Sequence, residues 1–318
     1  MSIDDDAPAA DKLRPTALNW LEYAGFRVVD RALHALPLPV AASVSAFFWR
    51  LIAPKLHRHR RAMANLHVAM PELSAEDRAT ILAAMWDNLG RTSAEALRLN
   101  EIADDPSAVT LNFSDDALAI LRGPQPAIFV SLHLGNWEVT PMAAERFKKP
   151  LIGVYKKVVN PLVEAVVVKQ RARFYPGGLV SRAPDAVRTI TRAIKAGFSV
   201  AIMADLRDTH GDFVPFFGIP SRSTPFPAML ARLHHLPIVA VRAVRTSPGH
   251  FRIDGETIAL AVSDHRKADI IENTGRIQAH LERWIRETPS LWMWGHRRWK
   301  ADAFAKMKSD AAGADLKS

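Results

Sequence analysis

The 318-residue sequence contains no cysteine. This absence excludes disulfide bonds, thiolate metal sites and a cysteine nucleophile, and it fits a reducing cytoplasm. The N-terminus lacks the basic start of a secretory signal, since Asp4, Asp5 and Asp6 stand there, so we expect no cleaved signal. The sequence also lacks internal repeats and low-complexity linkers, and we therefore expect a single catalytic domain with a helical N-terminal arm.

Several signature motifs are missing as well. No Gly-x-Ser-x-Gly elbow surrounds Ser131, so we do not expect a serine hydrolase. No helix-turn-helix, zinc or ribonucleoprotein motif accompanies the basic residues, so we do not expect nucleic acid as a partner.

Acidic residues are in the minority. The 42 Lys and Arg outnumber the 33 Asp and Glu, which gives a formal net charge of +9. Such an excess indicates an anionic partner, for example an acidic protein or a phosphate-bearing membrane. Near the C-terminus, Arg and Trp alternate in a pattern typical of a phosphate-rich membrane interface. The residues of this pattern are Trp294, Arg297, Arg298, Trp299 and Lys300.

Long apolar runs are scarce. The stretch 32–49 carries no Lys, Arg, Asp or Glu, but two prolines interrupt it and it is only just long enough to span a bilayer. Helical periodicity predicts helices over 16–36 and 40–53, each with one apolar face, and a basic cluster follows. We therefore predict that 16–61 forms an interfacial helical hairpin on an anionic membrane surface rather than a transmembrane span. The alternative is that both helices cover the soluble core. The apolar face of the second helix comprises Val40, Val44, Phe47, Phe48 and Leu51.

Short apolar runs alternate with helical patterns after this arm. This alternation predicts an α/β domain with a mostly parallel central sheet flanked by helices. Strands are expected at 127–132, 151–155, 179–180, 198–204, 237–244 and 251–258, and we expect the last two to pair across a turn. Helices are expected within 61–102, where Ser74 caps the second, and at 160–174, 184–196, 224–235 and 268–287. We assign 1–15 to a disordered tail, 16–61 to the membrane-interfacial arm, 62–302 to the catalytic domain and 303–318 to a flexible tail.

The segment 127–138 is the most informative part of the sequence. An apolar strand ends near His133, Gly135 permits a tight turn, and Asn136 can cap a helix whose first turn holds Glu138. Active sites of open α/β sheets lie at the carboxyl ends of strands. On one continuous helix, His133 and Glu138 would point about 140° apart. We therefore expect Glu138 to fold back and accept the Nδ1 proton of His133, which leaves Nε2 free as a general base.

A base with an orienting carboxylate, but without a protein nucleophile, suits direct attack of a substrate hydroxyl on a thioester. The alternative is that His133 is a core histidine and Glu138 a charge at a helix terminus.

This His-x4-Glu segment resembles the motif of the bacterial lipid A biosynthesis acyltransferases of the lauroyl and myristoyl type. The resemblance covers about residues 16–300, and its blocks follow the family order. The blocks are 60–66 with 71–73, 153–156 with 160–161, Asp205 with 213–218 and Thr224, and 289–300. Lys156 stands where the family often has arginine, and Asp205-Leu206-Arg207 departs from the commoner Asp-Gln, which leaves the acceptor and the chain length open.

The resemblance implies a fold similar to that of the glycerol-3-phosphate acyltransferases. It implies transfer of a fatty acyl chain from acyl carrier protein or acyl-coenzyme A to a hydroxyl of a lipid A precursor, a phosphorylated glycolipid of lipopolysaccharide biosynthesis. The place would be the cytoplasmic face of the cell inner membrane, and no metal or tightly bound cofactor is implied. We expect His133 and Glu138 to be catalytic, and Asn136, Lys156, Asp205 and Arg207 to bind substrate.

Lys156, Asp205 and Arg207 each follow a predicted strand, as His133 does, so we expect all four at one rim. Lys156 would hold an acceptor phosphate, and Asp205 and Arg207 would bind the acceptor or brace the active-site loop. A surface lysine and a local salt bridge are the alternatives. Two other functions stay open: an acyltransferase acting on another glycolipid or phospholipid, and a non-catalytic membrane-surface binding protein, against which the intact motif counts.

Overall fold

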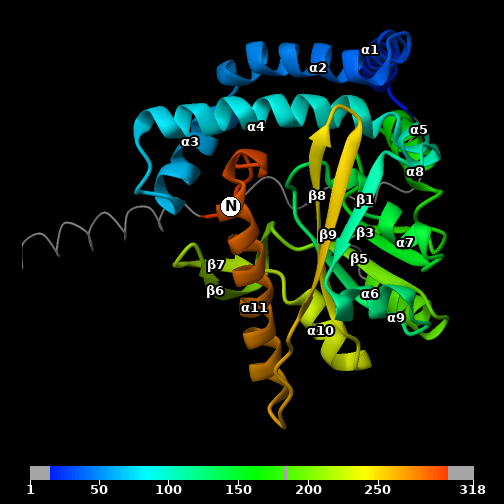
Figure 1. The fold of residues 1–318 in the computed structure, drawn as a ribbon, viewed down its shortest axis with the longest axis vertical. Helices are drawn as coiled ribbons and strands as arrows, with labels where there is room; N and C mark the ends of the chain where they lie inside the picture. The colour runs from blue at the N-terminus through cyan, green and yellow to red at the C-terminus, as the bar shows by residue number, and fades with distance from the viewer. Residues whose placement is uncertain (1–14, 182–184, 300–318) are drawn as a thin grey trace, which may run out of the picture.

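A seven-stranded sheet forms the centre of the computed structural model, which describes residues 15–181 and 185–299 (Figure 1). Lys300, the tail at 303–318 and nearly all of the tail at 1–15 lie outside the described residues. The strand order is β1-β9-β8-β2-β5-β3-β4, and β6 and β7 form a separate two-stranded sheet. The strands are β1 (Val109–Phe113), β2 (Ile128–Ser131), β3 (Leu151–Tyr155), β4 (Leu179–Ser181), β5 (Ser199–Met203), β6 (Arg207–Phe216), β7 (Ile219–Ser223), β8 (Ile238–Ser247) and β9 (His250–Ile258).

Most strand pairs of the large sheet are parallel. β2 pairs in parallel with β8 and β5, and β3 with β5 and β4. β8 and β9 form an antiparallel hairpin, and β1 runs parallel to β9. The mostly parallel sheet predicted from the alternating pattern is therefore confirmed, as is the pairing of the last two strands.

Helices cover both faces of the sheet because side chains along a strand alternate between its two faces. Ile128 and Val130 pack in one core with residues of α9, α10 and α11, whereas Ala127 and Phe129 pack in a second core with residues of α5, α6 and α7. The α-helices that follow α1 and α2 in the described chain are α3 (His57–Ala69), α4 (Ala75–Ala96), α5 (Leu99–Asp104), α6 (Asp115–Arg122), α7 (Met142–Arg146), α8 (Pro161–Arg171), α9 (Ala186–Lys195), α10 (Phe226–His234) and α11 (Arg266–Glu287).

The long helix α4 separates the N-terminal arm from the sheet. α1 (Ala17–His34) and α2 (Leu38–Ile52) lie on its outer side in Figure 1. The contact between α2 and α4 is close, because a Cβ atom built on Gly90 would lie 2.5 Å from the Cα of Ala46. Ser45 Oγ also donates to the carbonyl of Gly90 over 2.7 Å. Ser74 caps α4 through a capping box with Asp77, as the sequence predicts.

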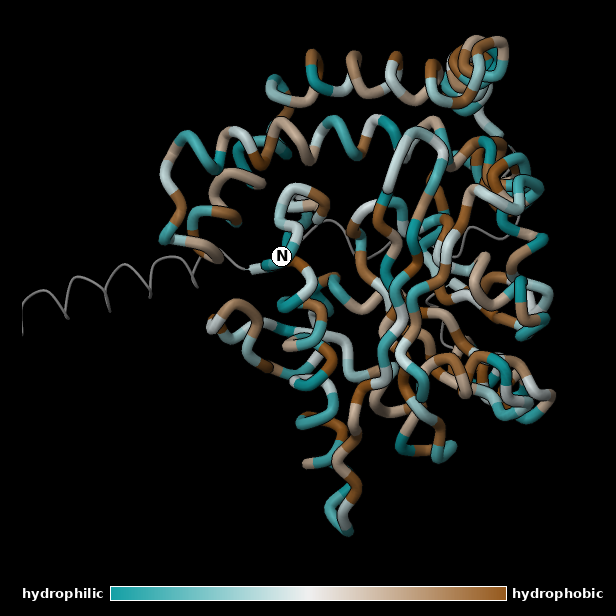
Figure 2. The backbone as a smooth tube through the Cα atoms, viewed as in Figure 1, coloured by the Kyte–Doolittle hydropathy of each residue, from teal (hydrophilic) through white to brown (hydrophobic). Residues whose placement is uncertain are grey.

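The apolar face predicted for the second helix is exposed. Phe47 and Phe48 are 55% and 51% exposed, and Val40, Val44 and Leu51 are exposed with them. Figure 2 shows hydrophobic residues along both α1 and α2. The charge-free stretch 32–49 is divided by the turn between these helices. Among the residues that the structure describes, no helix combines the length and apolar character that a bilayer span requires.

Candidate functional site

His133 lies two residues beyond the end of β2, and its ring contacts Asp205. Nδ1 of His133 is 2.9 Å from Oδ1 of Asp205, and the backbone N–H of His133 donates to Oδ2 over 2.8 Å. The indole N–H of Trp292 donates to the same Oδ2 over 2.9 Å. Asp205 is completely buried. A proton on Nδ1 can be donated to the Asp205 carboxylate, so the free basic nitrogen of the neutral ring is Nε2.

The parallel pairing of β2 and β5 brings these two residues together. Ser131 and Met203 are Cα partners at the ends of the two strands. His133 and Asp205 each follow two residues later, so they continue the same register past the carboxyl edge of the sheet. This edge is where open α/β sheets place their sites.

The contact shifts both ionisation equilibria. Burial lowers the pKa of His133, but the Asp205 carboxylate and, more weakly, the Glu138 charge outweigh burial, and the pKa lies above its ordinary value. Burial raises the pKa of Asp205, yet the charge and hydrogen bonds of His133 hold it well below its usual range. Asp205 is therefore an ionised carboxylate, which favours a stronger base at Nε2.

Glu138 is not the Nδ1 partner that the sequence-based prediction made it. Its carboxylate accepts from Arg171, the last residue of α8, over 2.9 Å from Nε and 2.5 Å from Nη2. The indole N–H of Trp137 adds a third bond of 3.1 Å. The helix expected here is a single 3-10 turn, η2 (Trp137–Val139), and its geometry directs the carboxylate toward α8. Glu138 acts on His133 through its charge, without a direct hydrogen bond.

Asn136 is fully buried and holds the loop from inside. Its Oδ1 accepts from the backbone of Glu138 over 3.2 Å, which is the predicted cap. Its Nδ2 donates to Glu95 on α4 over 2.8 Å. Arg245 of β8 binds both oxygens of Glu95, over 2.8 and 2.6 Å. The sequence analysis did not find this buried ion pair, because its members are 150 residues apart.

Close packing and hydrogen bonds also fix the backbone of this loop at Gly135. Gly135 has a φ of 62°, and a Cβ atom there would lie 1.9 Å from the carbonyl oxygen of Ala243. Any larger residue would therefore displace the loop. Asn88 and Thr92 of α4 donate to the carbonyl oxygen of Gly135 over 3.0 and 3.1 Å.

The C-terminal segment closes the site from the other side. The N–H of Met293 donates to the carbonyl of His133 over 3.0 Å, and Leu134 forms a β-bridge with Trp292. The ring of His296 packs edge-on against that of His133, with 4.7 Å between centroids. Burial, then the charge of His133, lowers the pKa of His296 to about 3, so this second imidazole is neutral at physiological pH.

Part of the C-terminal Arg and Trp pattern is core rather than membrane interface. Arg298, Trp294 and Trp299 are buried. Arg298 donates to Ser223 Oγ over 2.7 Å and to Gln278 Oε1 over 2.8 Å, and burial lowers its pKa to about 10. The interfacial interpretation is therefore wrong for these three residues, and Lys300 lies outside the described residues.

Lys156 lies at the carboxyl end of β3, and Arg207 lies two residues beyond Asp205. Lys156 is exposed directly after β3, and Arg207 is partly buried at the start of β6. Neither forms a hydrogen bond or ion pair with His133 or Asp205 within the described chain. Their contact with an acceptor stays a prediction.

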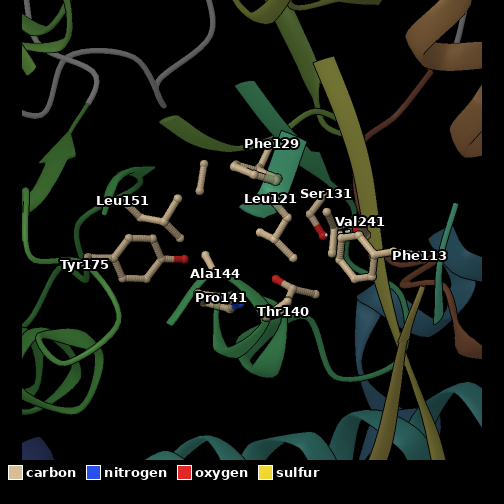
Figure 3. Close-up of a pocket in the computed structure, with 12 residues that line it drawn as sticks. Phe113, Leu121, Phe129, Ser131, Thr140, Pro141, Ala144, Leu151, Tyr175 and Val241 are labelled. Atoms are coloured by element: carbon tan, nitrogen blue, oxygen red, sulfur yellow. Dashed lines mark hydrogen bonds between the residues drawn. The ribbon is translucent and has the colours of Figure 1, made fainter. Parts of the chain in front are cut away.

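A small apolar cavity is lined by residues on either side of the loop 132–139, together with residues of the sheet and of α7 (Figure 3). Ser131 and Thr140, which flank that loop, contribute polar groups, and Tyr175 contributes its hydroxyl. Ser131 Oγ donates to the carbonyl of Val241 over 2.8 Å, so it is not placed as a nucleophile. The apolar part of the wall includes Phe113, Leu121, Phe129, Ala144, Leu151 and Val241.

Comparison with known proteins points to one family. The family model described as bacterial lipid A biosynthesis acyltransferase matches residues 9–301. The chain is 25% identical over 293 residues to the lipid A biosynthesis lauroyltransferase of Escherichia coli (strain K12), with 88% of this chain and 92% of that protein covered. It is 25% identical over 297 residues both to the lipid A biosynthesis palmitoleoyltransferase of the same organism and to a lipid A biosynthesis acyltransferase of Shigella flexneri. Those matches cover 88% of this chain and 91% of each protein.

Proposed function

This chain belongs to the bacterial lipid A biosynthesis acyltransferase family, and from that premise we propose that it transfers a fatty acyl chain from an acyl thioester to a hydroxyl of a lipid A precursor. The chain is thus an O-acyltransferase. The observation that carries the mechanism is the His133–Asp205 pair at the carboxyl edge of parallel strands.

In the proposed mechanism, His133 is the general base. Nε2 removes the proton from the acceptor hydroxyl while Asp205 holds the Nδ1 proton and stabilises the imidazolium. The resulting alkoxide oxygen attacks the thioester carbonyl carbon, and the tetrahedral intermediate then expels the thiolate. The imidazolium returns its proton to that sulfur, which completes an ester and a free thiol without an acyl-enzyme intermediate.

The remaining site residues divide between electrostatic and structural roles. We keep Glu138 in the catalytic site, where its charge stabilises the imidazolium and Arg171 fixes its position. We assign Asn136 to the support of the loop, because both ends of its amide are bound inside the protein. Lys156 and Arg207 remain our candidates for contacts with acceptor phosphates.

The membrane has a candidate place on the structure, whereas the acyl chain does not fit the apolar cavity beside 131–140. That cavity has a volume of about 30 Å³, much smaller than the roughly 150 Å³ cavity that holds one benzene molecule. The exposed apolar faces of α1 and α2 support attachment to the inner membrane at its cytoplasmic face. The donor is a thioester of acyl carrier protein or coenzyme A.

A reconstituted assay tests this function. Purified protein would receive an acyl thioester, on acyl carrier protein or on coenzyme A, and a phosphorylated lipid A precursor, and mass spectrometry would detect the added acyl mass. His133→Ala should abolish the product, and lipid A from a strain without the gene should lack one acyl chain. Unchanged lipid A together with a loss of acyl groups from another glycolipid or phospholipid would move the assignment to that acceptor.

A further inference from the structure

Two arginines of α3 lie beside the catalytic histidine's neighbour, His296. Arg61 Nη1 donates to the carbonyl of Gly295 over 3.3 Å. A Cβ atom on Gly295 would lie 3.7 Å from the carbonyl oxygen of Arg58, so the start of α3 runs directly along the C-terminal segment. The next residue, His296, packs on the His133 ring. The first turn of α3 is thus separated from the catalytic imidazole by one side chain.

Positive charge accumulates at the start of α3. The first turn of α3 carries no acidic residue, and no ion pair within the described chain joins Arg58 or Arg61 to a carboxylate. Burial and the neighbouring charges of Arg297 and Arg58 lower the pKa of Arg61, and both α3 arginines act on His296 in the same direction. The N-terminus of α3 has no side-chain cap, so the positive end of the helix adds to this potential.

The contrast with Arg171 and Arg245 is informative. Each of these arginines near the catalytic loop binds a carboxylate through two nitrogens. Arg58 repels Arg61, and the charges of both arginines help to keep His296 neutral, so this arrangement favours an anion that arrives with a ligand. Guanidinium groups and a helix N-terminus are the groups that best hold phosphate oxygens.

We propose that Arg58 and Arg61, with the uncapped N-terminus of α3, form a binding site for a phosphate group of the substrate beside His133. This assignment rests on the proposed function for the identity of the substrates. Two phosphates qualify chemically: one on the glycolipid acceptor, and the one on the phosphopantetheine arm of the donor. The site would fix the reacting end of a substrate near Nε2, so its loss should raise KM rather than remove the base.

The test compares charge-removing variants in neutral detergent micelles, where attraction to anionic lipid is absent. Arg58→Gln/Arg61→Gln should raise the KM for the phosphorylated acceptor about 10-fold or more, because the loss of a single charge-assisted hydrogen bond weakens binding by about tenfold or more. Arg58→Gln alone controls for structural damage, because among the described residues the Arg58 guanidinium has no hydrogen bond or ion pair that stabilises the fold. Arg58→Lys should recover part of the loss. Arg188→Gln/Arg192→Gln removes two exposed charges from α9, at the opposite end of the molecule in Figure 1, and should leave KM unchanged.

Substrates with and without the phosphate distinguish the acceptor from the donor as its source. If the acceptor supplies the phosphate, phosphatase-treated acceptor will be used equally by wild type and by Arg58→Gln/Arg61→Gln. If the donor supplies it, the KM for acyl-coenzyme A will rise instead, and acyl-pantetheine, which lacks the phosphate, will erase the difference. Equal KM values for the α3 and α9 variants with every substrate would overturn the site. So would a defect confined to sedimentation with anionic vesicles, because the arginines would then serve the membrane surface.

Failure of the proposed function would be recognised separately. Equilibrium binding of the phosphorylated and phosphatase-treated precursors would be measured on His133→Ala protein, where turnover is absent. Phosphate-selective binding that disappears with Arg58→Gln/Arg61→Gln supports the site even if no acyl transfer to this acceptor is found. Selective binding of the precursor that persists in the arginine variant excludes the acceptor as the source of the phosphate. If the KM for acyl-coenzyme A is then also unchanged in Arg58→Gln/Arg61→Gln, the site is overturned and the function stays intact.

Discussion

The imidazole of His133 is fixed on three sides. Asp205 holds Nδ1, and the rings of Trp137 and His296 pack against it with centroid distances of 5.0 and 4.7 Å. Only Nε2 remains for chemistry. Because the carboxylate raises the pKa of the ring, the same contact that orients the base also strengthens it.

Asp205→Asn should lower kcat/KM by about 10²–10⁴-fold, the usual contribution of an oriented general base. The base works only when neutral, so activity falls as the pH drops through the pKa of His133. Removing the Asp205 charge lowers that pKa, and the acidic limb of the pH–rate profile should therefore move to lower pH. Trp292→Phe removes a hydrogen-bond donor to Asp205 but keeps the carboxylate, so the acidic limb of its pH–rate profile should stay near that of wild type. If the acidic limb of the Asp205→Asn profile stayed at the wild-type pH, Asp205 would not control the pKa of His133.

Glu138→Gln tests the second carboxylate. It leaves Arg171 largely buried without its partner, which should lower the free energy of unfolding by about 1–3 kcal/mol. The acidic limb should move in the same direction as for Asp205→Asn but by less, because the Glu138 charge is the weaker influence on His133. In urea unfolding, Glu138→Gln/Arg171→Met should be less destabilised than the two single changes added together. Strict additivity would mean that the pair is not coupled.

The sequence singled out His133, the proposed base, but not the carboxylate that binds its Nδ1. The His-x4-Glu spacing draws attention to Glu138 because that residue is near in the chain, whereas Asp205 is 72 residues away in the register of β2 and β5. Both His133 and Asp205 follow buried apolar strands by the same interval. That equal interval was the available signal, and it becomes decisive only when the two strands are known to be neighbours.

Among the secondary-structure elements, most of the strands that the sequence predicted have buried apolar runs, although β4 and β9, which are only partly buried, were predicted as well. β2 is buried along its whole length, and β3, β5 and β8 have mostly buried runs. The pattern misses β1, whose residues alternate between half-buried and exposed, and β6, which is largely polar. It also misses α6 and the short α7. Apolar periodicity reports burial, so it cannot reveal elements whose pairing depends on distant strands.

Gly90→Ala on α4 tests how tightly the arm is joined to the site. The added methyl group would overlap the Ala46 backbone, so we expect a loss of about 1–3 kcal/mol in the free energy of unfolding. Activity should fall as well, because Asn88 on the same helix holds the carbonyl of Gly135. Urea titration and initial rates would measure both effects.

The matched control for this change is Gly275→Ala on α11. A Cβ atom there meets nothing within 4 Å, so the substitution should raise the free energy of unfolding by about 0.5–1 kcal/mol. If both alanine variants were equally stable, the close contact between α2 and α4 would not be significant.

At the scale of the whole molecule, both α1 and α2 of the arm are bound to the rest of the chain. α2 packs on α4, and Asn160 at the start of α8 donates to the carbonyl of Asn19 and to Glu22 on α1, over 2.9 and 2.8 Å. Deleting 1–61 would therefore remove support from the domain together with any membrane contact. Point changes on the exposed face are the sharper test of membrane attachment.

Phe47→Glu/Phe48→Glu should weaken binding to vesicles by about 10-fold or more per residue, since burying a phenylalanine contributes about 1.5–3 kcal/mol. Both side chains already face solvent, so the free energy of unfolding should change little. Flotation with vesicles containing anionic lipid would measure binding. Val187→Glu, on an exposed site of α9, is the control and should float like wild type. If the Phe47→Glu/Phe48→Glu variant floated like wild type, this face of α2 would not contact the membrane.

The register that joins β2 to β5 has a consequence for inactivation. The separation of His133 and Asp205 is set by backbone hydrogen bonds in the middle of the sheet rather than by a mobile loop. Central strands open only when the whole domain opens, whereas exposed segments exchange and fray at lower cost. Heat or denaturant should therefore leave the base and its carboxylate in register until global unfolding, and earlier losses of activity would arise at the substrate-facing periphery instead.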